Sequence, residues 1–113
     1  MHAADFELNV SLPADGRFAE TMRDLAVHAA RYAGYQESDA GRYAAAVEHV
    51  ALACLKRAGA GAGVTVIFRR NAGPLEFLIA CESPFDVPTA EGRVSVGWAN
   101  ERGTSMCRVT VEP

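Results

Sequence analysis

The chain has 113 residues, the size of one domain, and half of them are hydrophobic, which argues against intrinsic disorder. Its formal net charge is -3, so it lacks the broad basic footprint of a domain that binds nucleic acid. No stretch approaches the roughly 18 apolar residues that a membrane-spanning helix needs. We therefore expect residues 1–113 to form one soluble compact domain that binds neither nucleic acid nor membrane.

The three cysteines are Cys54, Cys81 and Cys107, and no two of them have the C-x-x-C spacing of a zinc knuckle or a thioredoxin-like motif. Their odd number, together with an N-terminus that lacks the basic and apolar regions of a signal peptide, favours a reducing cytoplasm. We expect no metal site, and we expect Cys81 to be a buried, inert thiol.

Apolar and polar residues alternate from Phe6 to Leu12, which predicts a half-buried strand that ends at Pro13. Asp15 is a suitable N-cap for a helix. Apolar residues then recur at helical spacing from Phe18 to Tyr32, and Gly34 is a natural helix stop.

A second helix is expected to begin at a cap formed by Ser38 or Asp39. Apolar side chains at helical spacing continue as far as Cys54, in a segment rich in alanine. The alanine-glycine tract at 58–63 follows. It lacks the Gly-Lys-Ser/Thr ending of a phosphate-binding loop, so it is interpreted as a flexible connector.

The second half of the chain predicts four strands. Residues 64–68 and 75–81 flank turn chemistry at 71–74 and should pair as a hairpin. A polar loop, 83–92, separates them from two further strands around 94–98 and 105–111. The expected fold is α+β, a two-layer sandwich with two helices on one face of a mainly antiparallel five-stranded sheet.

Glu48 lies within the second predicted helix, among apolar residues. At four-residue spacing it shares one helix face with Leu52 and Lys56. By itself this pattern fits a carboxylate on an exposed helix edge. The strand that ends at Cys81 and is followed by polar residues gives Glu48 a second context, that of a binding site.

That context comes with a resemblance that covers about four-fifths of the chain. The segments that carry it are Leu12-Pro13-Ala14, Ala33-Gly34-Tyr35 with the following Asp39, Ala44 to Glu48, Leu75 to Ala80, and Gly103 to Val109. In their order and spacing these segments resemble the histidine-kinase-like ATPase (GHKL) superfamily. They look most similar to the small anti-sigma-factor serine kinases of bacterial stress and sporulation control.

The resemblance implies an ATP and magnesium site, but the motif positions depart from the family pattern. Glu48 matches the family's water-orienting Glu. Leu52 stands where the family has a magnesium-binding Asn, and an aliphatic side chain offers no oxygen to a hard cation. Cys81 and Ser83 replace the Asp that reads adenine and the Gly that follows it. Residues 84–92 are too few for the family's glycine-rich lid and its helix.

These departures predict a non-catalytic regulatory module that needs no cofactor and binds a protein partner. The partner would be a sigma factor, a regulator of one, or a second copy of the chain. In one alternative the chain is an ATP-binding anti-sigma serine kinase with a divergent site and Glu48 as its general base. In another it binds a small molecule in the vacated pocket, lined by Leu52 and Cys81.

Overall fold

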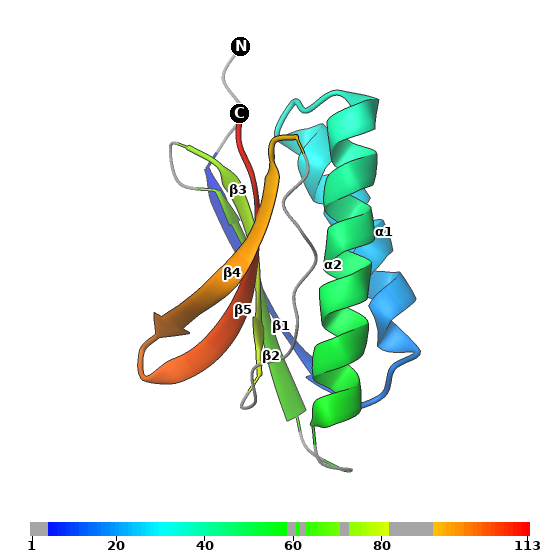
Figure 1. Ribbon diagram of the computed structural model, residues 1–113, viewed down its shortest axis with the longest axis vertical. Helices are drawn as coiled ribbons and strands as arrows, with labels where there is room; N and C mark the ends of the chain where they lie inside the picture. Colours follow the sequence, from blue (N-terminus) through cyan, green and yellow to red (C-terminus); the bar gives the residue numbers. More distant parts are fainter. Residues whose placement is uncertain (1–4, 59–60, 62, 71–72, 82–91) are drawn as a thin grey trace.

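The computed structural model describes residues 5–58, 61, 63–70, 73–81 and 92–113. Its elements, in chain order, are β1 (Phe6–Pro13), α1 (Phe18–Tyr32), α2 (Glu37–Arg57), β2 (Gly63–Arg70), β3 (Leu75–Ala80), β4 (Val94–Glu101) and β5 (Thr104–Val111). The two helices lie on one face of a five-stranded sheet (Figure 1), which confirms the predicted α+β architecture. Within the described residues no helix is long and apolar enough to cross a membrane.

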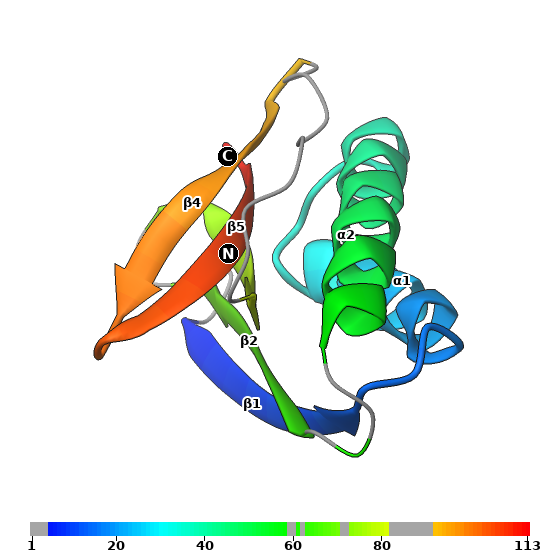
Figure 2. The same cartoon turned by 60° about the horizontal axis from the view of Figure 1, so that its bottom comes forward.

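The strand order in the sheet is β1-β2-β3-β5-β4, and every neighbouring pair is antiparallel. β1 and β4 are therefore the two edge strands. The predicted hairpin of β2 and β3 is present, with Arg70 opposite Leu75. The β4–β5 hairpin turns at Arg102 and Gly103, between the two strands expected around 94–98 and 105–111, and in Figure 2 it reaches away from the helices.

Helix α1 begins at Phe18, later than a cap at Asp15 predicts. The Asp15 side chain still has a capping role, because its Oδ1 accepts the backbone N–H of Arg17 at 3.0 Å. The helix ends at Tyr32, just before the expected stop at Gly34, whose φ of 87° is the left-handed conformation that glycine adopts without strain. There the Tyr35 N–H donates to the carbonyl of Ala30, which closes the last turn.

The prediction that Ser38 or Asp39 caps α2 is wrong. The cap residue is Gln36, without a side-chain hydrogen bond, and the helix begins at Glu37. A tertiary contact accounts for the earlier start, since the Tyr35 hydroxyl donates to the carbonyl of Val111 at 2.8 Å and fixes the chain just before the helix. Asp39 lies in the first turn instead, where a negative charge is favourable at the helix N-terminus.

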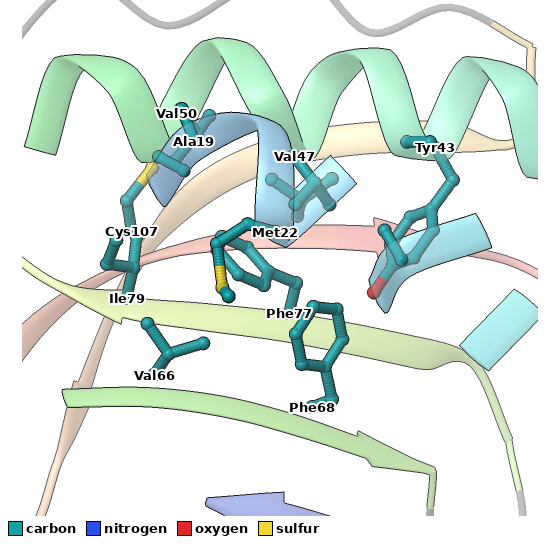
Figure 3. Close-up of a cluster of buried hydrophobic side chains, with 14 of the residues drawn as sticks. Ala19, Met22, Tyr43, Val47, Val50, Val66, Phe68, Phe77, Ile79 and Cys107 are labelled. Carbon is teal, nitrogen blue, oxygen red and sulfur yellow. The ribbon is translucent and has the colours of Figure 1, made fainter. Parts of the chain in front are cut away.

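The core lies between the helices and the sheet (Figure 3), and its largest fully buried side chain is Tyr43 of α2. Phe68 of β2 and Phe77 of β3 pack with their ring centroids 5.0 Å apart. The Tyr43 hydroxyl is buried and has no hydrogen-bond partner in the described part of the chain. Burial raises the pKa of this phenol well above its ordinary value, so it is neutral at any physiological pH.

Tyr35, just before α2, and Tyr43, within it, give a matched pair of substitutions. We expect Tyr35→Phe to lower the free energy of unfolding by about 1 kcal/mol, because a hydrogen bond to Val111 is lost. Tyr43→Phe should leave it unchanged or raise it by about 1 kcal/mol, because the hydroxyl it removes is desolvated and unpaired. Urea unfolding of both variants measures the difference, and equal losses would contradict the unpaired state of Tyr43.

Candidate functional site

Glu48 lies on the side of α2 that faces α1. Its Oε1 accepts a hydrogen bond from the Arg23 guanidinium of α1 at 3.3 Å. The two side chains are 35% and 52% exposed respectively, so the ion pair is partly in solvent. The carboxylate therefore has a cationic partner from the neighbouring helix. Sequence spacing could not identify Arg23, because helical periodicity relates residues of one helix and not of two.

Leu52 lies one helical turn after Glu48, and it is one of the few large apolar side chains that the described surface exposes. Its Cδ1 lies over Gly16, in the connection between β1 and α1. A Cβ atom at Gly16 would be 3.1 Å from that methyl group, closer than ordinary van der Waals contact. Leu52 thus covers the backbone of the connection, and glycine makes room for it.

Cys81 follows β3 directly and is buried. Its backbone N–H donates to the carbonyl of Ser105 at 3.0 Å, which continues the pairing of β3 with β5. Its thiol shares a hydrogen bond with the thiol of Cys54 on α2, and Cys107 of β5 is close enough to interact electrostatically with both. The three cysteines of the chain therefore form one cluster between α2 and the sheet.

The sequence holds only a partial signal for this thiol cluster, which was not predicted. Cys54 belongs to the buried stripe of α2, and Cys107 follows the apolar alternation of its strand. The pattern puts each thiol on a core-facing surface, but only the register of β3 against β5 and the position of α2 along the sheet bring them together.

The chemistry of the cluster is that of apolar packing. Burial raises the pKa of Cys107 to about 12, and burial together with the neighbouring thiols raises the pKa of Cys54 further. Both thiols are protonated at neutral pH, and a protonated thiol is neither a nucleophile nor a metal ligand. Within the described residues no group of three His, Cys, Asp or Glu side chains has a geometry that could hold a metal ion.

The residues at the nucleotide-site positions of the resembled family do not all lie at one site. Glu48 and Leu52 contact α1 and the β1–α1 connection, whereas Cys81 contacts Cys54. Cys54 is two positions after Leu52, so the two side chains point about 200° apart around α2. Cys81, which contacts Cys54, therefore lies on a different side of α2 from the Leu52 side chain. Ser83 and nearly all of the loop to Gly92 lie outside the described residues.

Comparison with known proteins does not identify a family for this chain. No family model matches the chain, and no curated protein matches it. The likeness to the GHKL superfamily therefore stays a hypothesis that rests on the sequence segments that carry it.

The geometry of Glu48 predicts a small structural role. We expect Glu48→Gln to lower the free energy of unfolding by less than about 1 kcal/mol, because a partly exposed ion pair is screened by water. A double-mutant cycle with Arg23→Gln, followed by urea unfolding, isolates the coupling between the two side chains. A coupling above about 2 kcal/mol would show that the pair is far better shielded than its exposure indicates.

The thiol cluster predicts slow labelling of the native protein. Because the pKa of Cys107 is raised from 9.0 to about 12, its thiolate fraction at pH 8 falls about a thousandfold. We expect iodoacetamide to alkylate Cys54 and Cys107 rapidly in guanidinium chloride and only through unfolding in buffer, as followed by mass spectrometry. Rapid labelling of either residue in the folded protein would contradict the cluster.

Proposed function

We propose that the chain is a non-catalytic regulatory module that binds a protein partner, on a scaffold related to the anti-sigma serine kinases. One observation carries the proposal, which is that the three described residues at the family's nucleotide positions, Glu48, Leu52 and Cys81, all contact other parts of the chain. Arg23 donates a hydrogen bond to the Glu48 carboxylate, and the thiols of Cys54 and Cys81 are hydrogen-bonded to each other. Leu52 covers Gly16. A module with these substitutions keeps the shape of the scaffold without its chemistry.

The donor set supports this proposal. Magnesium is bound through oxygen atoms in near-octahedral geometry, and at the family's metal position Leu52 has none. At the adenine position, the buried thiol of Cys81 is a weak hydrogen-bonding group and already has a partner in Cys54. The chain therefore needs neither ATP nor magnesium in the proposed role.

A surface suited to a protein partner runs along the edge strand β1 and the C-terminal part of α1. Leu8 is 44% exposed and Tyr32 is 61% exposed. The Tyr32 ring meets Phe6 edge to face, with centroids 5.6 Å apart, so the aromatic side chain is held in place before binding. Ordered aromatic residues beside aliphatic ones are typical of protein interfaces.

The proposed partner is a sigma factor, a regulator of one, or a second copy of this chain. The proposed compartment is the cytoplasm, in keeping with three cysteines that are all free thiols. A partner that presents an open strand edge or an apolar groove would fit β1, because β1 is paired on one side only.

The proposal predicts no useful affinity for nucleotide. We expect calorimetry with Mg-ATP to give a Kd weaker than about 1 mM. The double variant Leu52→Asn with Cys81→Asp should not create a nucleotide site, because positions 52 and 81 lie on different sides of α2. Its buried carboxylate at position 81 should also destabilise the fold. Micromolar binding by the natural chain, with hydrolysis that Glu48→Gln abolishes, would instead establish the ATP-dependent kinase.

A pair of lysine substitutions on β1 tests the partner surface. Leu8 and Ser11 are both exposed but face opposite sides of the sheet, so Leu8→Lys alters the proposed surface and Ser11→Lys is its control. Biolayer interferometry against sigma factors and anti-sigma antagonists encoded beside the gene should show binding that only Leu8→Lys weakens. Sedimentation velocity reports self-association, and equal effects of the two lysines would place the partner elsewhere.

A further inference from the structure

The sheet face opposite the helices, here called the outer face, is closed at one end by a long-range ion pair. Arg69 of β2 pairs with Glu101 at the end of β4. In the sheet order β3 and β5 separate these two strands, so the pair spans the outer face and not a neighbouring strand. The β4–β5 turn is thereby tied back towards β2, and the outer face is concave.

A groove of about 300 Å³ lies in this concave face. That volume is at the small end of the range for pockets that bind small molecules. Three segments contribute its walls: β1, β2, and the β4–β5 turn with the start of β5. The residues that line the outer-face groove are Glu7, Asn9, Thr65, Ile67, Arg69, Glu101, Arg102, Thr104 and Met106.

The charges in the groove leave one cation without a partner. Arg69 is occupied, because it pairs with Glu101 and donates from Nε to Glu76 at 3.1 Å. The Glu7 carboxylate accepts a hydrogen bond from the Asn9 side chain at 3.1 Å. Arg102, in contrast, has no ion pair or side-chain hydrogen bond within the residues that the structure describes.

The backbone at Arg102 is unfavourable for the residue it carries. Arg102 has a φ of 53°, the only positive φ outside glycine in the described chain, and Gly103 follows with a φ of 83°. A two-residue hairpin turn of this type favours Asn or Gly at both positions. A left-handed arginine costs about 1 kcal/mol, and such strain is found most often where a side chain has a function.

The remaining lining supplies apolar area and hydroxyl groups. Ile67 is partly buried, and Met106 is almost fully buried although it faces away from the helices. Thr65 and Thr104 add one hydroxyl each. The groove thus combines an apolar floor with a single free guanidinium, a group that binds carboxylates through two parallel hydrogen bonds.

We propose that the outer-face groove binds a small organic carboxylate, with its anionic group on Arg102 and its apolar body over Ile67 and Met106. This site is independent of the proposed partner surface, which lies on the helix-facing side of β1. The ligand enters without competition from Glu101, because Arg69 neutralises that carboxylate. Glu7 at the rim favours ligands with one negative charge over those with several.

Hexanoate is a suitable probe, with hexan-1-ol and hexylammonium as matched compounds that lack the negative charge. We expect hexanoate to cause saturable shifts in the ¹⁵N–¹H NMR signals of Thr65, Ile67 and residues 102–106. The alcohol and the amine should cause none at the same concentration. Binding of hexylammonium as strong as that of hexanoate would overturn the role of Arg102.

Two variants separate the site from the fold. Arg102→Gly should raise the melting temperature, because it relieves the left-handed strain, and should weaken hexanoate binding by about tenfold or more. Arg17→Gln removes an exposed arginine that precedes α1 and does not line the groove, so it should leave binding unchanged. Unaltered affinity in Arg102→Gly, or shifts spread evenly over the surface, would refute the proposed site.

Discussion

The packing of α2 across the sheet is the constraint on which the rest of the structure depends. Its buried stripe extends from Ala40 to Leu55 and combines small residues such as Ala44 and Ala51 with the larger Tyr43 and Leu55. The small residues allow α2 to approach both α1 and the sheet closely, and Tyr43, the largest fully buried side chain, points into the core between them. The same approach brings Cys54 onto Cys81 and turns Glu48 towards Arg23. The surroundings of Glu48, Leu52 and Cys81 thus follow from the placement of one helix.

Local periodicity predicted the elements because each periodic stretch has one apolar face to bury. The alternation in β1 and the helical spacing in α1 both survive in the structure. The start of α2 did not follow from local signals, because the contact of Tyr35 with Val111 joins residues that are far apart in sequence. Cap residues give a local preference of about 1 kcal/mol, which a single tertiary hydrogen bond can match.

The candidate site was less predictable than the fold because it, too, depends on contacts between residues that are far apart in the sequence. The sequence indicated that Leu52 and Cys81 differ from the family pattern, and this needs no knowledge of geometry. Whether the two residues share a pocket depends on the rotation of α2, which periodicity alone does not determine to within one residue. The ion pair between Arg69 and Glu101 could not be predicted from the sequence either, since it depends on how strongly the sheet twists between strands that are not neighbours.

The two faces of the sheet are held by different forces. Towards the helices, Phe68 and Phe77 are fully buried among apolar neighbours. On the outer face, Glu76 accepts from Arg69 and lies 3.6 Å from Arg108, so cross-strand ion pairs lie beside apolar side chains such as the buried Met106. These pairs are partly exposed and therefore sensitive to ionic strength, whereas the buried aromatic pair is not.

The contact between Leu52 and Gly16 links the evolution of two positions that are distant in sequence. Gly16 has no need of a left-handed backbone, so only the methyl group 3.1 Å away disfavours a side chain there. A lineage that shortens residue 52 to Ala or Asn frees position 16 to acquire a Cβ, whereas in a lineage that keeps Leu52 its side chain must shift by a few tenths of an ångström to admit one. Substitutions at the two positions should therefore covary among descendants of this sequence, with a small residue kept at position 16 wherever residue 52 stays leucine.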